Sequence, residues 1–96
     1  MRYFYRRETS ASGVERVFTV AYIHDRHTGE TQYGAAVFRR DSPSETFIKS
    51  EHRQTASGRL SKCPVSLTVK TETANELEQA IRDSIRSVGV RGPRPV

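Results

Sequence analysis

The sequence has no tryptophan, one methionine and a single cysteine, Cys63. One cysteine cannot form an internal disulfide and is typical of proteins from a reducing compartment, so we expect a cytoplasmic protein. No apolar run approaches the ~20 residues that a transmembrane helix needs. We also expect no signal peptide, because the arginine-containing N-terminus has no apolar segment. These absences exclude disulfide-stapled domains and helical membrane proteins.

Hydrophobic side chains are also scarce, at 34% of the 96 residues. A chain this short and this polar has room for one small core, so we expect a single domain over residues 1–90. Residues 91–96 contain two prolines and no hydrophobic periodicity. They are expected to form a flexible basic tail.

Catalytic and metal-binding motifs are missing as well. The sequence contains no GxxxxGK[ST], GxGxxG or GxSxG motif, which mark phosphate loops, dinucleotide folds and serine hydrolases. His24, Asp25 and His27 lie within one expected turn, but their spacing does not match a zinc site. A histidine pair for acid–base catalysis would require the fold to bring His52 to the same turn. We therefore expect no enzymatic activity, no cofactor and no metal site.

A β-hairpin is indicated by two neighbouring segments. β-Branched and aromatic residues dominate residues 15–24 and again residues 31–40. The polar segment between them contains Gly29, which suits a turn with positive φ. Further strands are expected at 2–7, 45–49 and 64–70.

Two helices complete the expected secondary structure. Thr73 and Glu76 match the pattern of a capping box, which predicts the start of an amphipathic helix over 74–88. A shorter basic helix, capped by Ser50, is expected over 51–61. Clustered strands followed by late helices predict an α+β fold. Specifically, we expect a mainly antiparallel sheet of four or five strands, with the C-terminal helix packed on one face and the basic helix between the last two strands.

Positive charge is in excess and is concentrated in the middle of the chain. Sixteen lysines and arginines face eleven acidic residues, which gives a net charge of +5. Thirteen of the sixteen are arginines, whose guanidinium groups bind phosphate or carboxylate in bidentate fashion. A GC-rich genome also raises the arginine content, so the excess alone does not prove an anionic partner. Residues 49–70 carry five of the cations against the single carboxylate of Glu51.

We expect the cations of the basic helix to form one outward-facing row that can follow a phosphate backbone. A solvated helix face is the alternative interpretation of the same charges. The candidate residues for binding nucleic acid or a protein partner are Lys49, His52, Arg53, Arg59, Lys62, Lys70, Arg91 and Arg94.

All eight aromatic residues lie within the first 47 positions. Five of them lie on expected strands and are candidates for a platform on which single-stranded bases stack: Tyr3, Tyr5, Tyr22, Tyr33 and Phe38. A sheet core is the alternative role, and we favour it because the chain has few aliphatic residues.

These observations predict a small basic, non-enzymatic module that docks on nucleic acid or a nucleoprotein through the surface around residues 49–62. The alternative is a small inhibitor or adaptor of the kind that phages and mobile elements encode. Such a protein would bind a host protein, for example a defence or transcription complex, through protein–protein contacts. An exposed sheet edge is a possible route to a homodimer.

Overall fold

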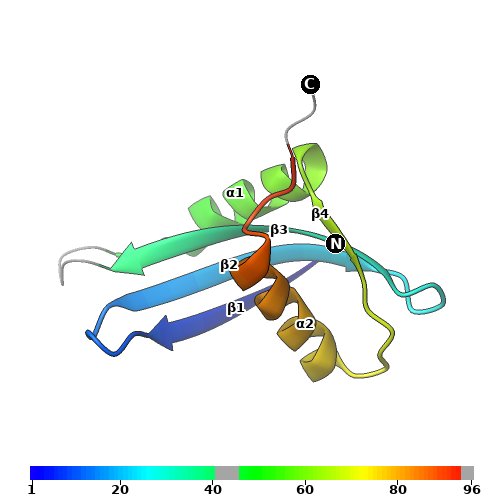
Figure 1. Ribbon diagram of the computed structural model, residues 1–96. Helices are drawn as coiled ribbons and strands as arrows, with labels where there is room; N and C mark the ends of the chain where they lie inside the picture. The colour runs from blue at the N-terminus through cyan, green and yellow to red at the C-terminus, as the bar shows by residue number, and fades with distance from the viewer. Residues whose placement is uncertain (41–45, 94–96) are drawn as a thin grey trace.

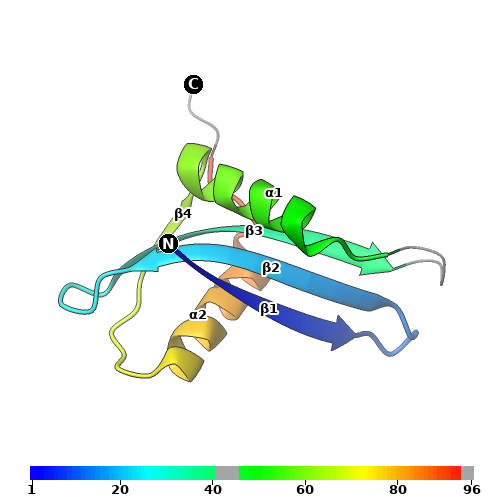
Figure 2. The same ribbon diagram turned by 180° about the vertical axis from the view of Figure 1, so that it is seen from behind.

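Four antiparallel strands form one sheet in the computed structural model, which describes residues 1–40 and 46–93 (Figure 1). In order across the sheet, the strands are β1 (Arg2–Thr9), β2 (Glu15–His24), β3 (Glu30–Arg40) and β4 (Val65–Thr68). Helix α1 (Lys49–Lys62) connects β3 to β4, and α2 (Ala74–Ser87) follows β4. The helices cover opposite faces of the sheet, as the views from front and back show (Figures 1 and 2). The predicted α+β fold, with the C-terminal helix on one face of an antiparallel sheet, is confirmed.

The central hairpin of β2 and β3 is organised by its turn. The Asp25 carboxylate accepts hydrogen bonds from the backbone N–H of His27 at 2.8 Å and of Thr28 at 3.3 Å. These two donors lower the pKa of Asp25, because they stabilise its charged form. Gly29 closes the turn with φ +80°, a conformation that other residues rarely adopt. The turn aligns the full length of β2 with β3, as predicted from the sequence.

The larger hydrophobic core lies between the sheet and α2. Its fully buried centre includes Val20, Tyr33 and Ile81. The hydroxyl of Tyr33 donates to the carbonyl oxygen of Gly89 at 2.9 Å and shares a second 2.9 Å hydrogen bond with Ser84. Burial raises the pKa of Tyr33. This core therefore anchors the last turn of α2 through a polar contact as well as through apolar packing.

The start of α2 keeps only half of the expected capping box. Thr73 is the N-cap, and its side chain accepts a hydrogen bond from the backbone N–H of Glu76 at 3.3 Å. The Glu76 carboxylate does not bond back to Thr73 and instead accepts from the hydroxyl of Thr71. The Thr73 N–H donates to that same hydroxyl oxygen at 3.2 Å. Thr71 therefore takes the place that the capping box assigns to Glu76.

The opposite face of the sheet has small side chains, so α1 lies close to the strands. Ala21 and Ala36 pack against Ala56 and Leu60 of α1 in a second, smaller core. Gly34 lies directly beneath the helix, and a methyl group there would be 2.2 Å from the amide nitrogen of Leu60. The helix backbone therefore rests on β3 itself, which holds α1 in place although it buries few side chains.

The C-terminal segment continues along the β4 edge of the sheet. The Ala35 N–H donates to the carbonyl oxygen of Val90 at 2.9 Å, and the Gly92 N–H donates to the carbonyl oxygen of Cys63 at 2.7 Å. The described part of the predicted tail, residues 91–93, is thus hydrogen-bonded to the domain at Gly92, whereas Arg94 lies outside the described residues. At the other side of the sheet, β1 is the edge strand.

The strand expected over residues 45–49 is not formed. Residues 46–48 have no regular structure and Lys49 begins α1, while residue 45 lies outside the described part of the chain. The backbone of Phe47 is not part of a strand, and its ring packs against the ring of Phe38. Packing across the sheet face has therefore overridden the local strand preference of this segment.

The start of α1 also differs from the prediction. Its N-cap is Ile48, whose side chain makes no capping hydrogen bond, and Ser50 lies within the first turn. The ring nitrogen Nδ1 of His52 lies 2.8 Å from the Ile48 carbonyl oxygen.

No helix in the described residues is long and apolar enough to cross a membrane.

The outer strands differ from the expected lengths. β1 extends to Thr9, because Glu8 and Thr9 pair with the start of β2. β4 ends at Thr68, and the next N–H, that of Val69, donates to the carbonyl oxygen of Gly29 at 2.8 Å. Strand β4 therefore ends where the chain bonds to the turn between β2 and β3.

Candidate nucleic-acid interface

Lys49 and Arg53 lie over tyrosine rings of the edge strand β1. The Lys49 Nζ is 4.5 Å from the centroid of the Tyr5 ring. The guanidinium carbon of Arg53 is 5.4 Å from the Tyr3 centroid and 5.6 Å from the Tyr5 centroid, and its Nε donates to the Tyr5 hydroxyl. All three distances are within the range of cation–π attraction. The two cations are therefore positioned by aromatic rings rather than by carboxylates.

Three further rings extend this arrangement toward β3. Phe47 lies between the others, with ring centroids 4.8 Å from His52, 5.7 Å from Phe38 and 6.5 Å from Tyr5. Phe38 and His52 are themselves 5.5 Å apart in an edge-to-face arrangement. All five rings are partly exposed. We call this group the aromatic–basic cluster, and it consists of Tyr3, Tyr5, Phe38, Phe47, Lys49, His52 and Arg53.

Two simple periodicities place these side chains together. Residues two apart on a strand point to the same face, so Tyr3 and Tyr5 share the α1 face of the sheet. Lys49, His52 and Arg53 are spaced as i, i+3 and i+4, and they share one side of the helix. The small residues beneath α1 let the helix approach closely enough for its first turn to reach the rings of β1 and β3.

The other candidate residues are distributed around the molecule. Arg59 turns toward β3, where its Nη1 donates to the carbonyl oxygen of Ala35 at 2.6 Å. Lys62, Lys70 and Arg91 are exposed at separate positions. Arg94 lies outside the described residues.

The expected single outward row of cations is therefore not formed. The exposed residues of α1 include uncharged ones between the cations, for example Gln54, Thr55 and Ser61. The helix instead directs Arg53 toward β1 and Arg59 toward β3. The physical reason is that a guanidinium group gains more from a ring face or a carbonyl oxygen beside the helix than from open solvent.

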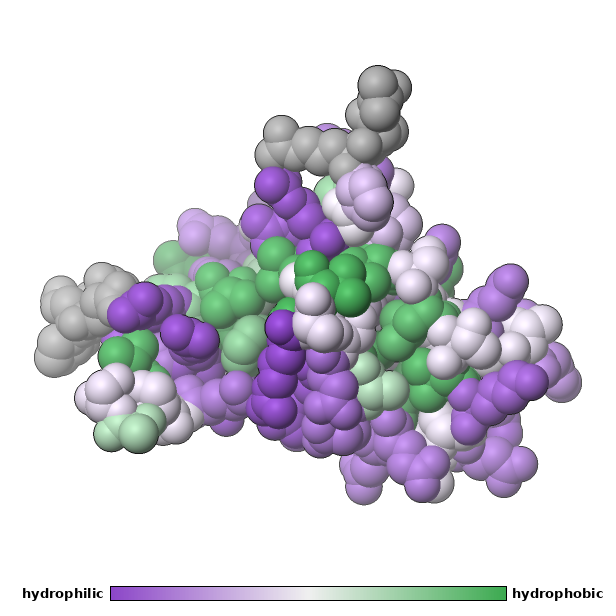
Figure 3. All heavy atoms as spheres, viewed as in Figure 1, coloured by the Kyte–Doolittle hydropathy of each residue, from purple (hydrophilic) through white to green (hydrophobic). Residues whose placement is uncertain are grey.

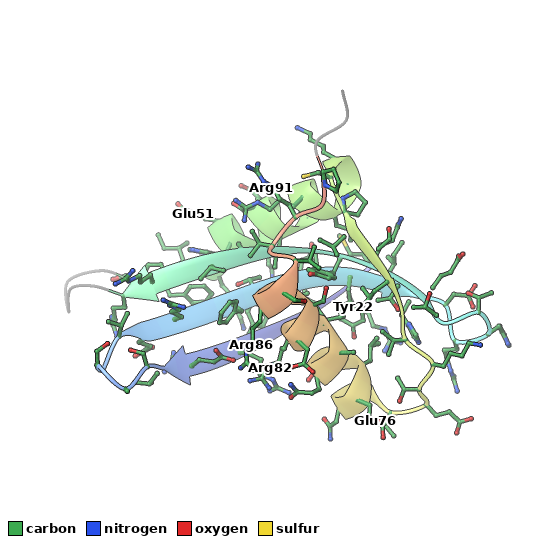
Figure 4. The ribbon with its side chains drawn as sticks, in the orientation of Figure 1. Tyr22, Glu51, Glu76, Arg82, Arg86 and Arg91 are labelled. Atoms are coloured by element: carbon green, nitrogen blue, oxygen red, sulfur yellow. The ribbon has the colours of Figure 1, made fainter. Side chains whose placement is uncertain are left out.

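Charge is unevenly balanced between the two faces of the sheet. On the α2 face, Glu8 accepts hydrogen bonds from Arg82 at 2.9 Å and from Arg86 at 3.0 Å, and Arg6 pairs with Glu78. These arginines lower the pKa of Glu8, chiefly through the hydrogen bond from Arg82. Figure 4 shows Arg82 and Arg86 on the side of α2 that lies over β1.

The cations of α1 have no such partners. Within residues 1–40 and 46–93, no carboxylate forms an ion pair with Lys49, Arg53, Arg59 or Lys62. Viewed from the α2 face, hydrophilic side chains cover that helix and hydrophobic ones lie on the sheet beside it (Figure 3). On the α1 face the described ion pair is that of Arg7 with Glu15 at 3.0 Å, on β1 and β2 and not on the helix.

The aromatic platform considered from the sequence is divided between the two faces. Tyr22 and Tyr33 belong to the buried core under α2, as the core interpretation predicts. Tyr3, Tyr5 and Phe38 lie on the other face and remain partly exposed. Phe47 was missed as a site residue, because the β-branched and aromatic residues of its segment favour a strand.

The histidines do not assemble into one site. His24 lies at the hairpin, where its Nδ1 is 2.7 Å from the hydroxyl of Thr31. His52 contacts Phe38. Phe38 lies seven residues beyond Thr31 on β3, which separates the two residues by about 23 Å. No group of three metal-ligating side chains gathers within the described ranges.

Comparisons of the chain with protein-family models, with characterised proteins and with solved structures find no significant match. The site's geometry therefore carries the functional argument by itself.

Proposed function

We propose that this chain is a small non-enzymatic module that binds nucleic acid, or a nucleoprotein complex, through the aromatic–basic cluster and the other cations of α1. One observation carries the proposal: the α1 cations lack carboxylate partners in the described structure, whereas the arginines beside α2 are paired with Glu8 and Glu78. Unneutralised cations are available to replace the counterions of a phosphate backbone.

The contacts of the cluster favour phosphate binding over base-specific readout. Lys49 and Arg53 are held at the rim of the sheet, and Lys62 is exposed one helix length away. Phosphate contacts fix the position of a nucleic acid without selecting its sequence.

The test is the salt dependence of binding to a fluorescently labelled oligonucleotide. The double variant Lys49→Glu/Arg53→Glu should weaken binding about tenfold or more and make the slope of log K against log[salt] shallower by about 1.4, or about 0.7 for each lost phosphate contact on a single strand. The matched control is Arg2→Glu/Arg26→Glu. It makes the same change in net charge at the hairpin end of the molecule, on two exposed residues.

A cluster variant that binds no more weakly than the control would refute the proposed surface. Salt-independent binding of the unmodified protein to both DNA and RNA would refute nucleic-acid binding altogether. Far-UV circular dichroism and thermal melts of both variants establish that the fold is retained.

A protein partner is the alternative, and the open edge of β1 favours it. In the described structure β1 is hydrogen-bonded to β2 on one side only, and an unpaired edge can accept a further strand. Tyrosine, phenylalanine and arginine are also among the residues enriched at the centres of protein interfaces. Pull-down from host extract with and without nuclease separates the two proposals: a protein retained after nuclease treatment supports an inhibitor or adaptor.

A further inference from the structure

We infer that the aromatic–basic cluster prefers single-stranded nucleic acid, with an unpaired base stacking on the Phe47 ring while Lys49 and Arg53, which lie over the tyrosine rings of β1, contact the phosphates. This inference rests on the proposed function and adds the class of nucleic acid. The aromatic rings of the cluster support it, because binding to phosphates alone does not require them.

The rings are the first part of the argument. Phe47 and Tyr5 are partly exposed, although each contacts two or more neighbours in the cluster. A surface that bound only a duplex backbone would gain little from such rings, because paired bases present no free faces. An unpaired base can stack on the Phe47 ring, and a stacked base contributes substantially to affinity. Partly exposed rings beside unneutralised cations are therefore suited to single strands.

The position of the cations is the second part. Lys49 lies over the Tyr5 ring, and Arg53 lies between Tyr3 and Tyr5. The base and the phosphate of one nucleotide are joined by a single sugar, so a nucleotide stacked at the rim of the cluster places its phosphate close to these two cations. The same two residues that the salt experiment tests are thus within one nucleotide of the rings.

The contrast with the other face is the third part. Tyr22 and Tyr33 are buried beneath α2, and the Tyr33 hydroxyl is fully engaged by Ser84 and Gly89. Those rings have no free surface for a base. Of the four tyrosines of the sheet, the two that are partly exposed therefore lie on the face where the α1 cations have no carboxylate partner among the described residues. Phe18 is also partly exposed, on the α2 face.

The chain lacks tryptophan, and this makes a direct experiment possible. Phe47→Trp introduces a single tryptophan into the cluster, and Val88→Trp introduces one at a 61% exposed position after α2 as a matched control. Unlabelled single-stranded DNA and RNA homopolymers and a duplex of equal length are titrated into each variant. Stacking predicts strong quenching of the tryptophan at position 47 by either single strand, weaker quenching by duplex, and little change at position 88.

A second variant separates stacking from packing. Phe47→Leu keeps an apolar side chain but removes the ring, and it should weaken single-strand binding about fivefold or more while changing duplex binding less than twofold. Phe47→Trp should retain single-strand binding, because its ring can stack. Melting temperatures of both variants report any loss of fold.

The outcomes distinguish this inference from the proposed function. If single strands and duplex bind equally and Phe47→Leu affects neither, stacking is refuted while salt-dependent nucleic-acid binding stands. If no nucleic acid binds in a salt-dependent manner, both fail. A change in the tryptophan emission at position 47 that follows protein concentration alone would assign the cluster to contact with a second copy of the chain, and would also refute the inference.

Discussion

The backbone of α1 lies directly on Gly34, so the substitution Gly34→Ala tests how the sheet holds the helix that carries the site. An added methyl group would lie 2.2 Å from the amide nitrogen of Leu60 and 2.5 Å from the carbonyl oxygen of Ala56. Real carbon contacts are almost never shorter than 3.0 Å, and the opposing atoms are backbone that cannot rotate away. The helix must therefore retreat by about 1 Å, which loosens the packing of both residues on the sheet.

Overpacking of this kind costs about 1–3 kcal/mol, and backbone opposition places Gly34→Ala near the upper end. For a domain of this size, about 3 kcal/mol lowers the melting temperature by about 12 °C or more. The matched control is Gly58→Ala in the same helix, where an added methyl group meets nothing within 4 Å. Alanine should stabilise that position by about 0.5–1 kcal/mol, because glycine is the poorer helix former.

Thermal unfolding followed by far-UV circular dichroism measures both variants. Gly34→Ala should also weaken oligonucleotide binding, since a displaced α1 carries Lys49 and Arg53 away from the tyrosines of β1. A Gly34→Ala protein that melts at or above the temperature of the unmodified chain would show that α1 does not rest on β3. That result would also refute the position of the aromatic–basic cluster.

Three further substitutions test other parts of the structure. Thr19→Val should raise the free energy of unfolding in urea by about 1 kcal/mol, because the Thr19 hydroxyl is fully buried and finds no hydrogen-bond partner among the described residues; a lower stability contradicts this. Tyr33→Phe should cost about 1 kcal/mol and speed amide exchange in the last turn of α2, where its hydroxyl is bonded; unchanged exchange would argue against that anchor. Glu8→Gln should reduce stability at neutral pH but not in acid. The pKa of Glu8 is lowered in the folded protein, so its contribution is present above pH 4.5 and is lost as the pH falls through the folded value. Urea titrations across pH should show the two proteins converging below pH 4.5, and a constant difference would contradict the assignment.

The residues that define α2 and the central hairpin show how far local pattern reaches. Asp25 and Gly29 specify the turn, and Thr73 specifies the start of α2 through its own side chain. Each of these signals acts over a few residues, so it is visible in the chain without knowledge of the fold. The fold class follows from the order of such elements.

Residues 45–49 show where local pattern fails. The β-branched and aromatic residues around Phe47 are typical of a strand, yet the ring reaches Phe38 and Tyr5 when the segment leads into α1. The energy of this packing depends on residues far away in the sequence. Strand propensity is weak by comparison, because it reflects the surface on which a side chain packs.

The sequence by itself determined that the chain is basic, that it forms an antiparallel α+β domain, and that its cations are concentrated around α1. Only the tertiary structure decided which cations are neutralised and which lie on aromatic rings. Glu8 meets Arg82 across 74 positions, and Arg53 meets Tyr5 across 48. Sequence periodicity reflects contacts between residues that are near neighbours in the chain. These two pairings depend instead on strand register and on the close packing of α1 over Gly34, which exist only once the sheet has formed.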